Sequence, residues 1–276
     1  MTVGIIGLGL IGGSMARAYH NAGHTVLGLD THKVTQGWAE LSGIINGNLE
    51  NTDDIGKCDL ILIAICPEAA VEWLKSNSEY ISKDALVIDL CGNKRIVCET
   101  GFKMAEKHGY TFAGGHPMAG THLAGIKNSR EDLFVGQPMV VVPPRHDDIA
   151  LFDRIKQALS PAGFGKITYT TAEAHDEMIA FTSQLAHVVS NAYIKSPRAT
   201  AHNGMSAGSY KDMTRVALLN ENMWSELFME NSDNLTNEID LLISELTKYR
   251  NALVNGDREK MTELLREGRI AKELAD

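Results

Sequence analysis

Short apolar runs alternate with helical stretches through the first part of the chain. The runs are Val3–Ile6, Thr25–Leu29, Leu60–Ile65, Ala85–Leu90, Thr111–Ala113, Met139–Val142 and Lys166–Thr170. A continuous apolar run is typical of a strand that is covered on both faces. Strands that alternate with helices predict an α/β fold whose parallel sheet is doubly wound with right-handed crossovers.

The pattern changes after Gly163-Phe164-Gly165, where the last short run is followed only by helical patterns. We therefore place a domain boundary near residue 165, between parts 1–165 and 166–276. An apolar seam in the second part steps by four and three residues: Leu235, Ile239, Leu242, Leu246, Tyr249 and Leu253. Such a seam needs a partner helix, which either an intrachain bundle or a second copy across a two-fold axis could supply.

Length, charge and cysteine content limit the number of domains, the kind of ligand and the compartment that the sequence allows. A chain of 276 residues with 44% hydrophobic residues is large enough for one large or two ordinary domains. The net charge of −9 argues against nucleic acid or an anionic membrane and favours a small-molecule ligand. The four cysteines form no C-x-x-C pair, and no leader or long apolar span is recognised. We expect a cytoplasmic protein with reduced thiols and without a metal site.

A glycine-rich loop follows the first predicted strand and opens a helix. Its G-x-G-x-x-G pattern consists of Gly7, Gly9 and Gly12. In this setting the first glycine permits a tight turn, the second lets the main chain approach a pyrophosphate, and the third allows the helix to pack on the strand. The helix N-terminus at Leu10 and Ile11 would face the phosphates. The loop predicts a dinucleotide-binding site.

Asp30 ends the second strand, about twenty residues beyond the loop, where the ribose hydroxyls of a dinucleotide would lie. A carboxylate there favours NAD, because it would repel the additional phosphate of NADP. The following Thr31, His32 and Lys33 leave some use of NADP open. Cys66 and Pro67 follow another strand at the same edge and are expected beside the adenosine.

The segment Gly114–Thr121, with the sequence GGHPMAGT, sets His116 between glycines and a proline just past a predicted strand. Glycine allows close approach to a ligand, and proline restricts the backbone after the histidine. Oxidation of an alcohol needs a base for the hydroxyl proton, and imidazole has a suitable pKa. We therefore predict His116 as that base; a tight turn with an incidental histidine is the alternative.

Residues 173–193 predict an amphipathic helix with an uncharged polar side. Gln184 and His187 lie on that side, and Asp176 precedes them. Asp176 and His187 are eleven residues apart, so a regular helix would place them on one face about 16 Å apart. This side could contact a ligand or another subunit, or it could be a packed polar stripe.

Arg215 ends the segment Gly208–Arg215, with the sequence GSYKDMTR. Its guanidinium could hold a substrate carboxylate through two parallel hydrogen bonds, a geometry that lysine does not offer. A surface salt bridge is the alternative.

Taken together, GLGLIGGS, GGHPMAGT, His175-Asp176 with His187, and YKDMTR followed by Met223-Trp224 resemble the prephenate and arogenate dehydrogenases of tyrosine biosynthesis. The resemblance spans nearly the whole chain. It implies a Rossmann-type, mostly parallel sheet followed by an all-helical dimerisation domain, in a homodimer with the active site between the two domains.

The resemblance also implies roles for individual residues. His116 matches the family's catalytic histidine, Arg215 its carboxylate-binding arginine, and His187 a histidine near the substrate side chain. Asp176 matches an acidic residue thought to help gate the cleft, and Gln184 with His187 could select between the two substrates. The implied reaction is NAD-dependent oxidative decarboxylation of prephenate to 4-hydroxyphenylpyruvate, or of arogenate to tyrosine.

Two positions depart from the family pattern. The family commonly has Asp-x-x-Ser-x-Lys after the fifth strand, and its serine bonds the substrate hydroxyl and the histidine, whereas this chain has Gly92 there. A water molecule or the Thr121 hydroxyl could take the place of that serine. Many members also have Glu after HPMAGT, where this chain has His122.

Two other functions stay open at this stage. A β-hydroxyacid dehydrogenase has a similar arrangement of domains, but it uses a Lys-x-x-x-Asn pair on the first long interdomain helix, and residues 178–194 contain no lysine. A non-catalytic dinucleotide sensor would keep the glycine loop without the chemistry. Gly92 favours such a sensor, whereas His116, His187 and Arg215 together argue against it.

Overall fold

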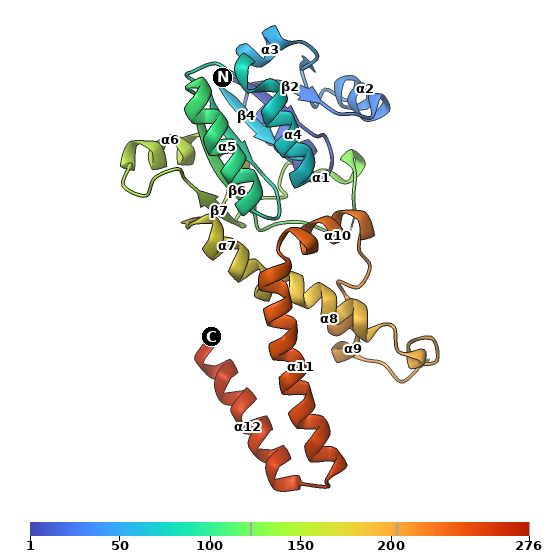
Figure 1. Cartoon of the computed structure of the whole chain (residues 1–276). Coiled ribbons are helices and arrows are strands. Elements are labelled where there is room, and N and C mark those ends of the chain that lie inside the picture. The colour runs from blue at the N-terminus through green and yellow to red at the C-terminus, as the bar shows by residue number, and fades with distance from the viewer. Residues whose placement is uncertain (122, 203, 276) are drawn as a thin grey trace.

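A computed structural model describes residues 1–121, 123–202 and 204–275. Its eight-stranded sheet has the order β3-β2-β1-β4-β5-β6-β7-β8. Figure 1 labels β2, β4, β6 and β7 of this sheet. The strands are β1 (Thr2–Ile6), β2 (Thr25–Leu29), β3 (Gly47–Asn48), β4 (Leu60–Ile63), β5 (Leu86–Asp89), β6 (Thr111–Pro117), β7 (Pro138–Val142) and β8 (Lys166–Tyr169). The strand order reverses direction between β1 and β4, which is where such sheets bind ligands.

Helices cover both faces of the sheet: α1 (Leu10–Asn21), α2 (Lys33–Leu41), α3 (Thr52–Gly56), α4 (Pro67–Asn77), α5 (Arg95–His108) and α6 (Ile149–Leu159). Adjacent residues of one strand enter opposite cores. Leu62 packs in the core under α1 and α6, whereas Ile61 and Ile63 pack in the core under α4 and α5. Because both sides of each central strand are apolar, the strands were recognisable as uninterrupted runs.

The sheet differs from the prediction at β6 and β7. β6 pairs in parallel with β5 through Ala113, and then Gly114–Pro117 pairs with β7 in antiparallel register. His116 therefore lies within a strand, opposite Val140, rather than just past one. The glycines hid this extension because they carry no apolar side chain. A Cβ on Gly115 would stand 2.6 Å from the Asp89 carbonyl oxygen, so the close packing requires glycine.

The sheet ends slightly beyond the predicted domain boundary. β8 pairs in parallel with β7, so Lys166–Tyr169 belongs to the sheet. The remaining elements are helical: α7 (Ala172–Ile179), α8 (Leu185–Tyr193), α9 (Gly208–Thr214), α10 (Glu221–Glu230), α11 (Ser232–Val254) and α12 (Arg258–Ala275). Within the described residues, no helix is both long enough and apolar enough to cross a membrane.

The predicted helix over residues 173–193 contains a π-helical turn, Ala180–Gln184, between α7 and α8. A π-helical turn holds more residues than an α-helical turn and rotates everything that follows it. Asp176 and His187, which a regular helix would place on one face, lie on either side of this turn and contact different elements: Asp176 bonds to the start of α5, and His187 stacks on α10.

α11 and α12 form an antiparallel pair that projects away from the sheet (Figure 1). Gly256 has a φ of +65° where the chain turns between them, and Asp257 caps α12 by accepting the Lys260 N–H at 2.8 Å. The apolar seam of α11 is only partly covered within one chain. Leu235 is 5% exposed, whereas Leu253 is 71% exposed.

Candidate active site

The glycine loop has the geometry that a dinucleotide needs. Gly7 has a φ of +88°, which favours glycine, and its N–H donates to the Leu29 carbonyl at 2.7 Å. A Cβ on Gly12 would stand 1.8 Å from the Gly7 carbonyl oxygen, so only glycine lets α1 pack this closely. A Cβ on Gly9 would meet nothing within 4 Å. Open space therefore borders the main chain before Leu10, where a pyrophosphate would approach the N-terminus of α1.

Asp30 lies at the end of β2 with both carboxylate oxygens held by backbone amides. Oδ2 accepts from Leu8 at 2.9 Å, and Oδ1 accepts from His32 at 2.8 Å. These bonds orient the carboxylate beside the glycine loop. Lys33, which could have favoured a 2′-phosphate, is paired with Glu50 at 3.2 Å.

Other predicted cofactor contacts also lie at this edge of the sheet. Ile11 stands in the first turn of α1, where the N–H groups lack intrahelical partners. Cys66 is exposed after β4, and Pro67 is the buried first residue of α4. The carboxyl ends of β1, β2 and β4 therefore bring the predicted dinucleotide contacts together.

His116 lies at the same edge, near the end of β6, and contacts a second histidine. Its Nδ1 is 2.9 Å from His175 Nε2, and the ring centroids are 5.1 Å apart. His175 Nδ1 is in turn 2.7 Å from Asp176 Oδ1. His175 is 3% exposed and Asp176 1%, whereas His116 is partly exposed. The three side chains form a row that begins inside the protein and ends at the partly exposed His116 near the carboxyl end of β6.

Burial lowers the pKa of His116, and the neighbouring His175 and the Lys94 cation lower it further. Burial likewise lowers the pKa of His175, although Asp176 partly opposes this effect. Burial alone would raise the pKa of Asp176, but hydrogen bonds from His175 and from the Arg95 and Lys94 amides bring it below its ordinary value. At neutral pH the row therefore consists of two neutral imidazoles and a carboxylate.

A buried ion pair fixes β6 next to His116. Lys94 and Asp89 side chains are both 0% exposed and are in direct contact. Lys94 Nζ also donates to the Gly115 carbonyl at 2.6 Å, and Asp89 Oδ1 accepts the Gly115 N–H at 3.3 Å. Both backbone groups of the residue before His116 are thus bonded to this pair.

Gln184 was predicted to contact substrate, but the structure buries it in an amide network. It is 1% exposed, its Nε2 donates to Asn93 Oδ1 at 3.0 Å, and its Oε1 accepts from Asn231 at 2.9 Å. Asn93 in turn donates to the Leu227 carbonyl at 2.8 Å. These bonds join the loop after β5 to the helical part, so Gln184 is placed to hold the two parts together.

His187 and Arg215 form a second group in the helical part. The His187 ring stacks on Trp224, with centroids 3.8 Å apart, and its Nδ1 donates to the Ser183 carbonyl at 2.9 Å. Burial lowers the pKa of His187, and the nearby charge of Arg215 also lowers it. Arg215 is exposed at the end of α9, and its side chain has no ion pair among the described residues. Arg215, a cation with no ion pair in the described part of the chain, therefore lies near a histidine that stacks on Trp224.

Gly92 and His122 are the two positions that depart from the family pattern, and the structure describes only Gly92. A Cβ on Gly92 would stand 3.1 Å from a methyl carbon of Leu227, so α10 occupies the space beside this glycine. Thr121 is exposed, and its hydroxyl bonds locally with the backbone of Leu123. His122 lies outside the described residues. No hydroxyl bonds to His116 within the described part of the chain; its partner there is His175.

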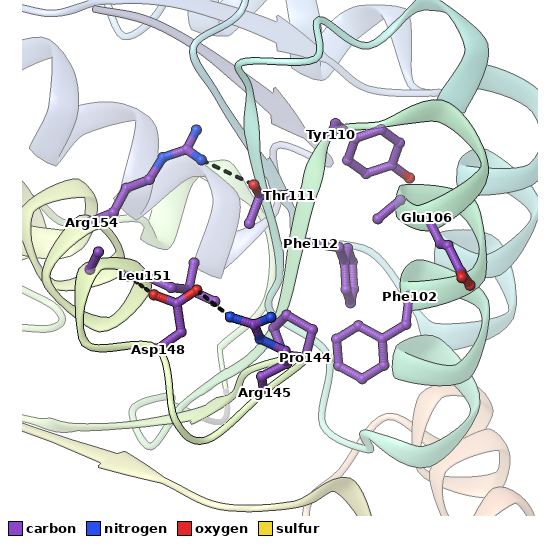
Figure 2. Close-up of a pocket in the computed structure, with 12 residues that line it drawn as sticks. Phe102, Glu106, Tyr110, Thr111, Phe112, Pro144, Arg145, Asp148, Leu151 and Arg154 are labelled. Carbon is purple, nitrogen blue, oxygen red and sulfur yellow. Dashed lines mark hydrogen bonds and ion pairs between the residues drawn. The ribbon is translucent and has the colours of Figure 1, made fainter.

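A hollow of about 480 Å³ lies elsewhere, between α5, the start of β6 and α6 (Figure 2). Phe102 and Phe112 form part of its wall, Arg145 pairs with Asp148, and Arg154 donates to Thr111. It borders the amino end of β6, whereas His116 lies near the carboxyl end. Its lining includes neither the glycine loop nor a histidine, so we do not assign the chemistry to it.

Two family models together match most of the chain. Residues 15–168 match the nucleotide-binding domain of prephenate dehydrogenase, and residues 171–267 match its dimerization domain. The chain belongs to the prephenate dehydrogenase family. The first match begins after the glycine loop, so the loop is assigned on its own geometry.

Individual members of the prephenate dehydrogenase family match along their length. The cyclohexadienyl dehydrogenase of Zymomonas mobilis is 29% identical, over 98% of this chain and 94% of that protein. The prephenate dehydrogenase of Bacillus subtilis is 25% identical, over 100% of this chain and 75% of that protein. A solved prephenate dehydrogenase from A. aeolicus, in complex with hydroxyphenyl propionate and NAD⁺, has a TM-score of 0.83 at 25% identity, with 100% and 98% of the two chains covered.

The β-hydroxyacid alternative shares the fold at lower similarity. A 3-hydroxyisobutyrate dehydrogenase from Salmonella typhimurium has a TM-score of 0.60 at 12% identity, over 91% of this chain and 95% of that chain. This likeness concerns the fold alone. The family matches place the present chain with the prephenate dehydrogenases.

Proposed function

We propose that this protein is an NAD-dependent dehydrogenase that oxidises and decarboxylates prephenate or arogenate. The observation that carries the proposal is the placement of His116. Its Nδ1 is bonded inside the protein, and its Nε2 has no partner among the described residues, at the sheet edge that also carries Gly9 and Asp30. A base and a dinucleotide loop at one edge suit the oxidation of a bound alcohol.

His116 accepts the proton of the substrate's ring hydroxyl at Nε2 in this mechanism. Gly9, Leu10 and Ile11 would hold the pyrophosphate of NAD⁺ and Asp30 its ribose, and the bound cofactor would supply the hydride acceptor. Loss of hydride and proton turns the carbinol carbon into a carbonyl. The ring carboxylate then leaves as carbon dioxide. The electrons of the broken bond make the ring aromatic and leave a phenolate oxygen, which takes back the proton held by His116.

Arg215 binds a carboxylate of the substrate, and His187 lies beside the substrate side chain. Lys94 and Asp89 keep Gly115 fixed, so that His116 does not need to be ordered again when substrate arrives. These assignments place the base on the nucleotide-binding part and the carboxylate contact on the helical part.

The working form is a homodimer in the cytoplasm. Exposed apolar residues on α11 and α12, including Leu246, Leu253 and Leu265, support burial against a second copy. The match to a dimerization domain supports the same conclusion. All four cysteines are free thiols, as expected in a reducing compartment.

The absorbance of NADH, followed with prephenate and separately with arogenate, tests the function. His116→Asn removes the base while leaving the glycine loop intact, so we expect turnover to fall by roughly 10²–10⁴ with little change in NAD⁺ affinity. His146→Asn is the matched control, because His146 is exposed after β7.

Unchanged turnover in His116→Asn would remove the proposed base. A protein that binds NAD⁺ but oxidises neither compound would instead support the sensor. Preferential oxidation of a short hydroxyacid would favour the β-hydroxyacid dehydrogenase.

A further inference from the structure

The two ring nitrogens of His175 have different partners. Nδ1 lies 2.7 Å from Asp176 Oδ1, and Nε2 lies 2.9 Å from His116 Nδ1. At 3% exposure, His175 leaves neither nitrogen to solvent. The protons in this row are therefore placed by the protein, and their positions follow from the chemistry of its inner end.

Asp176 determines the first proton. Its Oδ1 also accepts the Lys94 N–H at 2.8 Å, and its Oδ2 accepts the Arg95 N–H at 2.9 Å. A protonated carboxyl would direct its hydroxyl at one of these donors, whereas a carboxylate accepts from all of them. Asp176 is therefore ionised, and the short contact to His175 requires that His175 Nδ1 donates.

The second proton follows from the first. A neutral imidazole that donates from Nδ1 has a lone pair on Nε2. The contact between His175 Nε2 and His116 Nδ1 is then a hydrogen bond only if His116 donates. A neutral His116 with its proton on Nδ1 has its own lone pair on Nε2, which is the nitrogen without a partner among the described residues.

We propose that Asp176 and His175 are positioning residues that hold His116 as the Nδ1–H tautomer, with Nε2 ready to accept a proton from the substrate hydroxyl. The proposal rests on the function proposed above and assigns His175 a role that the sequence motif alone did not. After proton transfer, the His116 imidazolium donates through Nδ1 to His175, with the carboxylate of Asp176 behind it. The transferred proton is then the only change in the net charge of His116, His175 and Asp176 taken together.

The surrounding charges favour a neutral His175. Lys94, at the N-cap of α5, is close enough for its charge to act on both histidines, and that charge is paired with Asp89. Arg95 of α5 contacts the far oxygen of Asp176 at 3.4 Å. If His175 gained a proton, its Nε2 would become a donor, and His116 would have to accept at Nδ1 and carry its proton on Nε2. The base would then be lost, so protonation of His175 contributes to the loss of kcat at acid pH.

Nitrogen-15 spectroscopy of histidine-labelled, full-length protein tests the tautomer directly. His116 is assigned by comparison with His116→Asn, and the spectrum is recorded at neutral pH without substrate. We expect a protonated Nδ1 and an unprotonated Nε2 on His116. A protonated Nε2 in the wild-type protein overturns the proposal, whatever the variants do.

Two substitutions of one residue separate positioning from packing. In His175→Gln, the side-chain oxygen can occupy the place of Nε2 and accept from His116. In His175→Asn, the shorter amide can occupy the place of Nδ1 and donate to Asp176, but it does not reach His116. We expect kcat within about tenfold of wild type for Gln and a loss of roughly 10²–10⁴ for Asn, with KM for NAD⁺ unchanged in both. Circular dichroism and thermal melting report whether each variant is folded.

The outcomes distinguish this proposal from the function on which it rests. If His116→Asn loses turnover but folded His175→Asn keeps the wild-type kcat and pH profile, the positioning role fails and the function stands. If His116→Asn also keeps turnover, the proposed function itself fails. A shift of the acid limb in folded His175→Gln, together with retained kcat, supports the proposal, because a purely structural residue would not move that limb.

Discussion

Replacing Lys94 with methionine would leave a buried carboxylate without its cation. The Lys94 and Asp89 side chains are both 0% exposed, so the carboxylate left behind lies away from bulk solvent. Methionine fills a similar volume but cannot donate to Asp89 or to the Gly115 carbonyl. Breaking a buried ion pair on one side costs about 3–5 kcal/mol. At roughly 2–4 °C per kcal/mol for large domains, the expected fall in melting temperature is about 6–20 °C.

Thermal unfolding followed by circular dichroism measures this loss at neutral pH. Lys103→Met is the matched control, because Lys103 pairs with Glu99 on the surface at side-chain exposures of 69% and 73%. Exposed pairs contribute about 0–1 kcal/mol, so the control should melt close to wild type. The double substitution Asp89→Leu with Lys94→Met removes both charges and should recover part of the stability lost in the single variant.

The reasoning is refuted if the Lys94 and Lys103 variants melt at the same temperature. It is also refuted if the double variant is less stable than Lys94→Met alone, because the isolated carboxylate would then not be the source of the cost.

Two further predictions concern the substrate contact and the junction between the two parts. Arg215→Lys should raise KM for substrate by roughly 10–100-fold and change kcat less, because lysine cannot form two parallel hydrogen bonds to a carboxylate. Arg266→Lys on α12 is the control. An unchanged KM in Arg215→Lys would exclude the contact between Arg215 and substrate. Burial, opposed by a bond from Asn93 and supported by nearby acids, raises the pKa of Glu230 to about 7. The folded protein therefore holds this proton more tightly than the unfolded chain, and stability falls as the carboxyl ionises toward about pH 7. The melting temperature of Glu230→Gln should therefore fall less than that of the wild type as the pH rises toward about 7. An identical pH dependence in wild type and variant would contradict the raised pKa of Glu230.

The central sheet could be predicted because its strands are apolar on both faces. The run Thr25–Leu29 matches β2 at both ends, and the predicted turn at Gly7 has the positive φ that glycine favours. The edge of the sheet was harder to predict. β6 continues through two glycines, and its antiparallel pairing with β7 depends on contacts between strands, which no local pattern reports.

His116 and Asp30 could be named as candidates from the sequence because their residue types imply a chemistry, and their roles stay predictions. The roles of His175 and Gln184 depend on tertiary placement. His175 lies beside Asp176 in the sequence, and that adjacency was the available signal, but its contact with His116 spans 59 residues. Gln184 belonged to an uncharged polar stripe, and a packed stripe and a ligand-facing stripe have the same composition.

The π-helical turn between α7 and α8 adds one residue to an otherwise α-helical segment. Deleting a residue from Ala180–Gln184 would restore regular winding and turn every later side chain by about 100° while moving it about 1.5 Å along the axis. His187 would then leave Trp224, whereas His175 and Asp176 upstream would keep their places. The loss of a single codon would thus re-aim His187 and the residues after it without moving the contacts of His175 with Asp176 and His116.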